Sequence, residues 1–550
     1  MLDKKKEKQE WQLFYLFIML MSAGIFMLVY GVNVLNPCYD DWLLGRGDLT
    51  QHYLGWVFYR KTDWKFPIGL TNQLAYPLDS SVIFTDSIPL LAVFFKIFSA
   101  FLPETFQYFG WWGILSFMLQ GLFTAKILRE FGVGKLPIVL ASILFVLSPT
   151  VIEKMFRHTA LGGHWIILFS IYLFVRHRRG YQDVLRSSIQ WGMVGFLIGS
   201  IHLYYLPMCG MILAGYVFCS ILCERRIRLK HLMPGITFTI ALFVTTYLLG
   251  GFSTKAESGS DGLGYYSFNL NGFFNSKGYS RFLPSLTMYQ EGQYEGFAYL
   301  GLGVFGLLFF AILYLIFRMV GRKPDAMAVM YGVVYGLISL GLIILAASPQ
   351  VSFGDKLLFE FPDIDMIIDY WTIFRSSGRL VWPVCYLLFM GAVVGCERFC
   401  KQYIHSEKIA ILIIAACTAL QVYDLSSKLG GQNDTFAPKI TYESIMEDEL
   451  WDKLAQVESL EHVVWVSHNL DTPKVLAMAK FAADHDLTMN NFYFARGINV
   501  NEYTKESMSN LNESCVYIFR PEEPERLAEY DLNYYEVDGY IVGTVFTLED

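Results

Sequence analysis

The segment 36–69, "NPCYDDWLLGRGDLTQHYLGWVFYRKTDWKFPIG", gathers acids, a histidine and aromatic rings in a chain that is otherwise strongly apolar. The run DLTQHYLGW has helical spacing, which would place Asp48 and His52 one turn apart on the same face. A carboxylate at the mouth of a cavity can take the proton of an attacking hydroxyl group. Asp48 is therefore the first candidate for a general base, and Asp41 is the second. The structural alternatives are a helix-capping role for Asp48 and solvated loop positions for Asp40 and Asp41.

Two later segments carry arginines suited to binding an anion. In "FRSSGRLVWP", Arg375 and Arg379 are four residues apart, which predicts that they share one face of a helix. Paired guanidinium groups can hold a phosphate or diphosphate through several hydrogen bonds. Arg157, in "VIEKMFRHTALGGHW", is a third candidate. For Arg157, a charged cluster at a helix end that reaches toward water is an equally good explanation.

Residues that could contact a substrate lie in the same segments. The segment 262–303 is rich in glycine, asparagine and aromatic residues, a composition that suits a sugar but also an aromatic belt at the membrane surface. Histidines near membrane depth usually face an interior or a wet cavity, although simple packing is the alternative. The candidate substrate-binding residues are His52, Trp56, Asp86, His164, His202, Tyr294 and Glu295.

A divalent metal ion is a further candidate ligand of these loops. Their aspartates and histidines could assemble a site for it. However, the loops contain no Asp-x-Asp motif and no closely spaced histidine pair that would enforce metal binding. The sequence therefore leaves a metal unassigned and identifies no certain cofactor.

The elements that must position these residues are membrane helices. The chain has 550 residues, of which 54% are hydrophobic and only 17% charged. Many apolar runs approach the ~20 residues that a helix needs to cross the hydrocarbon core. About eleven spans are expected, near residues 11–35, 105–128, 135–151, 164–176, 187–201, 205–223, 232–252, 297–318, 326–347, 379–396 and 408–424.

The basic loops orient these spans. The N-terminal "KKKEK" and later loops such as "RHRRG" and "CERRIRLK" are expected in the cytoplasm, because positively charged loops are retained there. The odd number of spans then puts the first loop, residues 36–87, and the C-terminus outside. The segment 88–102 is too short to span and carries Lys96, so we expect an interfacial helix there.

The C-terminal part differs in charge from the membrane part. From Leu425 onward, 23 acidic residues stand against 9 basic ones, whereas the preceding part has 34 basic and 27 acidic residues. Short strand-like runs alternate with helical patterns such as "DTPKVLAMAKFAADH". The sequence therefore predicts a mostly α-helical polytopic membrane domain, residues 1–428, and a small extracytoplasmic α/β domain, residues 429–550. Nucleic acid is not an expected partner of either part.

The stretches "GDLTQHYLGWVFYRKTDWKFPIG", "FTDSIPLLAVFFK", "QYEGFAYLGLG" and "FRSSGRLVWP" resemble, as a set, a bacterial branch of the GT-C superfamily. These are multi-pass glycosyltransferases that use polyprenyl-phosphate-linked sugars. The resemblance covers residues 11 to about 424 and implies that the aspartate of the first outer loop, here Asp48, is the catalytic base. The Asp-Glu pair common in the superfamily is absent, because Leu49 follows Asp48, so the base can be Asp48, Asp41 or both.

The resemblance implies an inverting glycosyltransferase of the bacterial cytoplasmic membrane. Its partners would be a polyprenyl-phosphate-linked sugar, membrane lipid and an extracytoplasmic glycan, lipid or protein acceptor. Two other classes remain as alternatives, a flippase or transporter of lipid-linked glycans and a non-catalytic membrane scaffold. The scaffold alternative predicts that the acids and arginines of the separate loops lie far apart.

Overall fold

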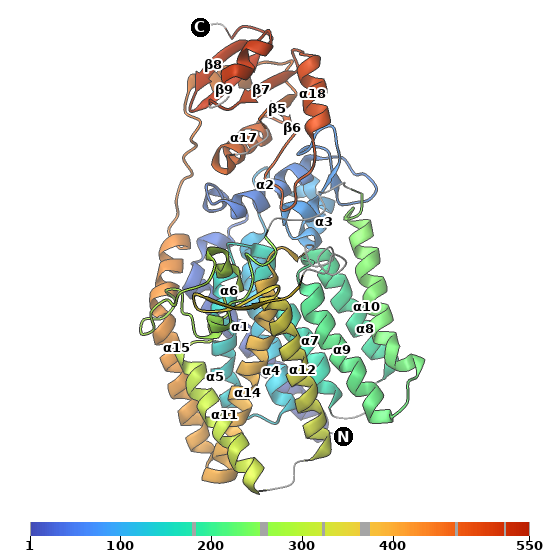
Figure 1. Cartoon of the computed structure of the whole chain (residues 1–550), viewed down its shortest axis with the longest axis vertical. Helices are drawn as coiled ribbons and strands as arrows, with labels where there is room; N and C mark the ends of the chain where they lie inside the picture. Colours follow the sequence, from blue (N-terminus) through green and yellow to red (C-terminus); the bar gives the residue numbers. More distant parts are fainter. Residues whose placement is uncertain are drawn as a thin grey trace.

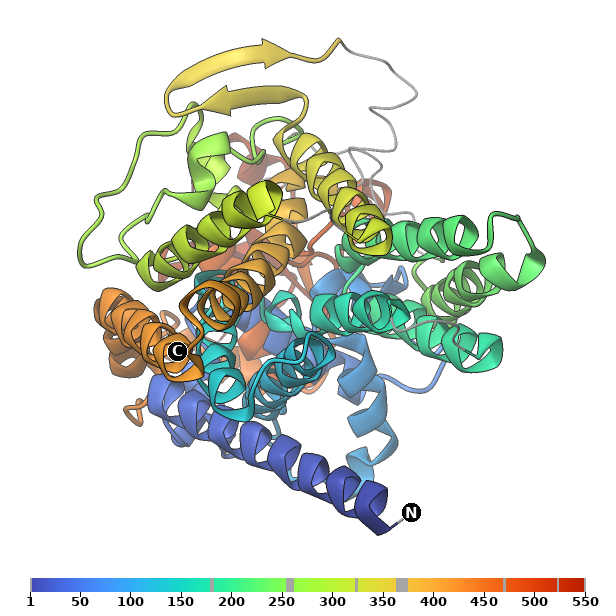
Figure 2. The same cartoon turned by 90° about the horizontal axis from the view of Figure 1, so that it is seen from below.

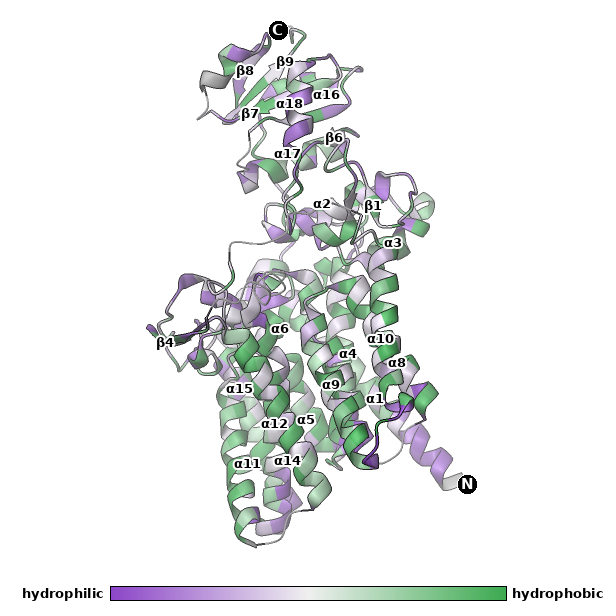
Figure 3. Ribbon diagram, turned by 45° about the vertical axis from the view of Figure 1, so that its right-hand side comes forward, coloured by the Kyte–Doolittle hydropathy of each residue, from purple (hydrophilic) through white to green (hydrophobic). Residues whose placement is uncertain are grey.

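The computed structural model of the chain describes residues 2–178, 183–253, 262–321, 325–362, 374–467, 471–521 and 524–548. Within these ranges, eleven candidate spans are long and apolar enough to cross a membrane, as predicted. They form a bundle with the N-terminus at one end and the C-terminal domain beyond the other (Figure 1). Hydrophobic residues dominate the bundle, and polar residues become frequent beyond its upper end (Figure 3).

Figure 2 views this bundle from below, with α8, α9 and α10 grouped at one side. The helices of the membrane part are α1 Leu2–Tyr30, α4 Phe109–Glu130, α5 Lys135–Val146, α6 Pro149–Lys154, α7 Trp165–His177, α8 Val184–Ile201, α9 Tyr205–Glu224, α10 Leu229–Leu248, α11 Leu302–Gly321, α12 Ala326–Ala347, α14 Trp382–Phe399 and α15 Glu407–Phe436. The α5 and α6 helices together make one candidate span.

Small residues allow some of these helices to approach closely. A Cβ atom at Gly195 of α8 would lie 2.2 Å from the carbonyl oxygen of Phe238 in α10, so only glycine fits there without a shift. Helix pairs in membranes commonly use small residues in this way, because lipid leaves packing as a main source of association. The pair α8 and α10 is accordingly the most extensively packed pair in the bundle.

The first loop folds into a compact layer on the upper end of the bundle. It contains α2 (Asp48–Lys61), the short strands β1 (Leu70–Thr71) and β2 (Ser80–Ser81), and α3 (Pro89–Ile97). The α3 helix exposes apolar side chains such as Phe94. The predicted short helix within 88–102 is therefore present, and it is not among the candidate spans.

The C-terminal domain is α/β, as predicted. Its sheet has the strand order β6-β5-β7-β9-β8, in which β5 runs parallel to β6 and β7 while β9 is antiparallel to β7 and β8. The elements are α16 Glu449–Ala455, β5 His462–Trp465, α17 Thr472–Asp484, β6 Thr488–Met489, α18 Asn501–Ser509, β7 Cys515–Phe519, β8 Asn533–Val537 and β9 Tyr540–Thr544. Upstream of it, α15 continues to Phe436, past the predicted end of the last span at residue 424.

The C-terminal domain is bonded to the first loop. The backbone of Met489 donates to the Gln73 carbonyl and accepts from the Tyr76 amide, each at 2.8 Å. The Ala495 amide donates to the Phe84 carbonyl, also at 2.8 Å. The segment 489–496 thus lies directly over the first loop, next to the region that holds Asp48 and Asp86.

Candidate functional site

Asp48 is the first residue of α2, and the N-cap position is occupied by Gly47 rather than by Asp48. Helix capping therefore does not account for the aspartate. Its Oδ2 atom lies 3.1 Å from Nδ1 of His158, in the segment that follows α6. The Asp48 side chain is 28% exposed, so the carboxylate is held by a partner while it still borders open space.

Glu295 is the centre of a buried ionic cluster next to this pair. Its Oε2 atom accepts from Lys154 Nζ at 2.7 Å and from Arg379 Nε at 2.8 Å. Burial alone would raise the pKa of Glu295, but the charges of Arg379 and Lys154 hold this pKa well below its usual range. Two cations and one carboxylate leave the cluster with a net positive charge. A buried charge is tolerated only when it is paired in this way.

His158 links the cluster to Asp48. Its Nε2 atom lies 3.3 Å from Arg379 Nη2 and 3.3 Å from Glu295 Oε1. Burial and the charges of Lys154 and Arg379 lower the pKa of His158 well below its usual value, so the imidazole is neutral at neutral pH. An ionised Asp48 can only accept, so we assign the single proton of the neutral ring to Nδ1. Nε2 then accepts from Arg379, because a guanidinium can only donate, and Glu295 Oε1 is a close neighbour of Nε2 rather than its hydrogen-bond partner.

The environment of Asp48 strengthens it as a base. Burial raises the pKa of Asp48, while a hydrogen bond from Tyr493 and the charge of Arg157 oppose the rise in part. A carboxylate with a raised pKa binds a proton more tightly than a solvated one, which favours proton transfer from a hydroxyl group. Tyr493 belongs to the C-terminal domain, so that domain contributes to the site.

Asp86 forms a second aspartate–histidine pair. Its Oδ1 atom lies 3.5 Å from His202 Nε2. Burial raises the pKa of Asp86 to about 7, against the opposing charge of Arg379. The φ angles of Asp86 and Ile88 are both 52°, in the left-handed region that a branched residue such as isoleucine rarely adopts. Such backbone strain persists where the surroundings enforce it, commonly at functional sites.

Three further cations lie next to the ring of Tyr294 or that of the neighbouring Tyr266. The Arg157 guanidinium lies 5.0 Å and the Lys277 ammonium 4.9 Å from the centre of the Tyr294 ring. Arg375 donates from Nη2 to the Tyr266 hydroxyl at 2.9 Å. Burial lowers the pKa of Lys277 to about 8. This edge of the site can attract an anion without breaking the Glu295 cluster.

The prediction that Arg375 and Arg379 share a helical face is wrong. Arg379 lies in a 3-10 turn, Ser377–Val381, that precedes α14, whereas Arg375 lies before this turn. Arg379 is buried against Glu295 and Arg375 contacts Tyr266. The two arginines therefore serve different parts of the site.

Four predicted residues lie outside the ionic cluster. His52 Nδ1 is 3.3 Å from the Thr159 hydroxyl, and Trp56 donates to the Phe106 carbonyl. His164 Nδ1 lies 2.7 Å from the Tyr386 hydroxyl. The Asp41 carboxylate accepts from the amide of Tyr442. Asp41 thus fixes the linker between the membrane part and the C-terminal domain.

Sequence reasoning did not select Lys154, His158, Lys277 or Tyr493. Lys154 and His158 are four residues apart in "IEKMFRH", the segment that supplied Arg157, so their spacing was a usable signal. Tyr493 had no signal, because its partner lies in a different domain. Across the described ranges, no group of three or more histidine, cysteine or acidic side chains is arranged to hold a metal ion.

The fold and the site define a multi-pass helical membrane protein with an ionic site at one end of the bundle, next to the first loop and the C-terminal domain. The chain belongs to the family described as "Domain of unknown function (DUF6311)", whose model matches residues 19–426. The model of the DUF6311 C-terminal domain matches residues 450–545. A search of curated protein sequences gave no match.

Several solved structures are similar to this chain. They include apo ArnT from Cupriavidus metallidurans, with a TM-score of 0.44, 13% identity, and coverage of 98% of both chains. An Archaeoglobus fulgidus oligosaccharyltransferase tethered to an acceptor peptide has a TM-score of 0.48 and 12% identity, covering 97% of this chain and 74% of that one. AglB from the same organism, in complex with an inhibitory peptide and a dolichol-phosphate, has a TM-score of 0.44 and 11% identity, covering 98% and 75%. Similarity at this level identifies no activity.

Proposed function

We propose that this protein is a glycosyltransferase that transfers a sugar from a polyprenyl-phosphate-linked donor to a hydroxyl group of an acceptor outside the bacterial cytoplasmic membrane. The observation that carries the proposal is the convergence of Asp48, His158 and the Arg379–Glu295 pair. The four stretches that resemble the GT-C superfamily contain Asp48, Asp86, Glu295 and Arg379 in turn. The residues behind the resemblance and the residues of the site thus coincide.

Asp48 acts as the base in this proposal. It takes the proton of the acceptor hydroxyl while the acceptor oxygen bonds to the anomeric carbon and the bond from that carbon to the lipid phosphate breaks. The neutral His158 donates to Asp48 and fixes its orientation. A single displacement of this kind inverts the anomeric configuration.

The cations around Tyr294 receive the departing lipid phosphate. Lys277 and Arg375 lie at the partly exposed edge, where a lipid phosphate can arrive from the membrane surface. Arg157 lies at the same edge and is half-exposed, although its Nη1 atom is paired with Glu153. Arg379 is already bonded to Glu295, so it adds positive potential rather than a direct phosphate contact. Fixed cations in a partly dry site can stabilise developing negative charge by several kcal/mol.

Asp86 and His202 hold hydroxyl groups of the sugar. A carboxyl group with a pKa near 7 can both donate and accept hydrogen bonds at neutral pH, which suits a sugar hydroxyl. Above them, the segment 489–496 of the C-terminal domain covers the acceptor side. The acceptor would enter between this segment and α2.

The alternatives explain less. A scaffold predicts that the charged residues of the separate loops lie apart, yet they form one connected cluster. A flippase or transporter needs a polar path through the membrane, whereas the cluster lies at one end of the bundle. In contrast, a glycosyltransferase uses both a base such as Asp48 and a group of cations that can bind the departing phosphate.

The test is Asp48→Asn in the expressing strain, with glycan and glycolipid products measured by mass spectrometry. Removing a general base should lower product formation by about 100-fold or more at equal protein abundance. Asp40→Asn is the matched control, because Asp40 lies in the same loop and bonds the Tyr53 hydroxyl instead. Wild-type product levels from Asp48→Asn would reject Asp48 as the base.

A further inference from the structure

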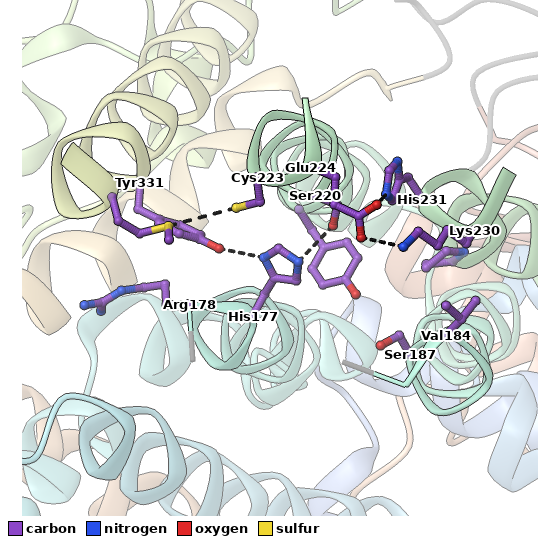
Figure 4. A pocket seen from close by; sticks show the side chains of 13 residues that line it. His177, Arg178, Val184, Ser187, Ser220, Cys223, Glu224, Lys230, His231 and Tyr331 are labelled. Atoms are coloured by element: carbon purple, nitrogen blue, oxygen red, sulfur yellow. Dashed lines mark hydrogen bonds and ion pairs between the residues drawn. The ribbon is translucent and has the colours of Figure 1, made fainter. Parts of the chain in front are cut away.

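A second polar recess lies at the opposite end of the bundle, on the side of the N-terminus. It has a volume of about 170 Å³, and its walls come from α7, α8, α9, α10 and α12 (Figure 4). The space is larger than a single water site. The proposed transferase reaction gives this recess no role.

Hydrogen bonds through His177 join three of the walls. Its Nδ1 atom lies 2.6 Å from the Tyr331 hydroxyl of α12, and its Nε2 atom lies 3.0 Å from the Ser220 hydroxyl of α9. Figure 4 shows this imidazole between the two hydroxyl groups. The recess is thus a polar space held in a defined shape within an apolar bundle.

One carboxylate in the recess faces several cations. Glu224 at the end of α9 lies 2.5 Å from Lys230 Nζ, 3.2 Å from His231 Nε2 and 3.6 Å from Arg228 Nη1. Among the described residues of this group, the two basic side chains of Lys230 and Arg228 stand against the one carboxylate. Arg178 adds another cation to the lining, with its guanidinium stacked on a neighbouring phenylalanine ring. A fixed positive excess of this kind favours an anionic ligand.

Apolar side chains flank this charge. Leu185 at the start of α8 is 68% exposed and Leu229 at the start of α10 is 66% exposed, and Met327 of α12 is also exposed. The recess lies at the ends of candidate spans, the level at which lipid headgroups meet the protein. Basic pockets between membrane helices at this level commonly bind anionic lipid headgroups.

We propose that this recess binds the phosphate group of an anionic membrane phospholipid, with the acyl chains lying along α8 and α12. Lys230, in the lining, and Arg228, beside the recess and paired with the lining Glu224, would face the phosphate. Retention of positive loops on one side of the membrane explains exposed arginines such as Arg225 and Arg226. Such retention does not explain why a polar recess of defined shape lies between the helices. A second source of the same chemistry is free inorganic phosphate, and the experiment separates the two sources.

The experiment is native mass spectrometry of the purified full-length chain titrated separately with dioleoyl phosphatidylglycerol, dioleoyl phosphatidylcholine and inorganic phosphate. Arg228→Ala and Lys230→Ala should each weaken phosphatidylglycerol binding by about fivefold, the usual effect of one cation near an anionic headgroup. Lys135→Ala is the matched control, because Lys135 is a half-exposed cation paired with Glu10 outside the recess. The control should bind phosphatidylglycerol as the wild type does.

Three outcomes would overturn the proposal. They are equal binding of the two lipids by the wild-type chain, equal losses in Lys135→Ala and in the recess variants, and displacement of phosphatidylglycerol by equimolar inorganic phosphate. Because Arg228 is half-exposed, its replacement keeps the fold, so a misfolded Lys230→Ala does not prevent the test. Products of the proposed transferase reaction play no part in this readout.

Discussion

At the scale of single residues, the site is a chain of contacts in which each group fixes the next. Glu295 binds Arg379, Arg379 donates to His158, and His158 holds Asp48. Asp48 is the most exposed member, His158 is partly exposed, and Glu295 and Arg379 are buried. These contacts therefore set the position and the proton affinity of Asp48 through groups that need not touch a substrate.

Glu295→Gln tests the first residue in this series of contacts. The substitution keeps the shape but leaves Lys154 and Arg379 buried without a countercharge, which costs about 3–5 kcal/mol when one partner of a buried pair is removed. We expect a clear fall in the melting temperature of the detergent-solubilised protein. Glu10→Gln is the control, since Glu10 and its partner Lys135 are both about half-exposed and such a pair contributes about 1 kcal/mol or less. Equal melting of the two variants would mean that Glu295 is not ionised.

Asp86 gives a pH-dependent prediction. Its pKa is raised to about 7, above the usual value of 3.8, so the folded state holds this proton more tightly than the unfolded state. The stabilisation is complete below pH 4 and is lost as pH rises through 7. Asp86→Asn removes the ionisation and tolerates the positive φ, so it should melt higher than the wild type at pH 8 and not at pH 4.

The control for this pH effect is Asp86→Ala. It also removes the carboxyl group, but alanine tolerates the left-handed conformation less well, at a cost of about 1–2 kcal/mol. It should therefore melt below Asp86→Asn at both pH values. A wild-type melting temperature that does not change relative to Asp86→Asn between pH 4 and pH 8 would contradict the raised pKa.

At the scale of elements, hydropathy was sufficient for the spans and insufficient for the turns between them. Apolar runs of nearly 20 residues predict helices because the membrane leaves few alternatives, and the start of α2 at Asp48 followed from helical spacing. The prediction that Arg375 and Arg379 share a helical face was wrong because Pro383, in the first turn of α14, favours a helix start near Trp382. The bond between His158 and Asp48 joins two loops, and periodicity within one segment carries no information about such a contact.

The turn that precedes α14 gives the third prediction. Arg379 makes two contacts, from Nε to Glu295 and from Nη2 to His158, which a lysine cannot reproduce. Arg379→Lys should therefore lower product formation by about tenfold or more, as expected for the loss of more than 1.4 kcal/mol of transition-state stabilisation. Arg375→Lys keeps a positive charge at the edge and should have a smaller effect. A larger loss of product formation in Arg375→Lys than in Arg379→Lys, measured in isolated membranes, would exchange the roles of the two arginines.

At the scale of the whole molecule, the C-terminal domain is seated on the first loop and adds Tyr493 to a site built from the membrane part. Backbone bonds from Met489 and Ala495 and the ion pair between Lys61 and Asp486 join the two parts. The acidic composition from Leu425 onward predicted a separate domain but gave no sign that it reaches the site. Its contribution through Tyr493 could be found only in three dimensions.

Tyr493→Phe tests whether this interdomain contact tunes the base. The hydrogen bond from Tyr493 lowers the pKa of Asp48, so its removal should raise that pKa further. Because a base acts only when deprotonated, the acidic limb of the pH–rate profile in isolated membranes should move to higher pH, with the rate at high pH little changed. Tyr503→Phe is the control, since Tyr503 lies in the same domain as Tyr493 but its ring packs against Tyr76 of the first loop. An unshifted acidic limb in Tyr493→Phe would separate the C-terminal domain from the chemistry of Asp48 and leave it a role in acceptor binding alone.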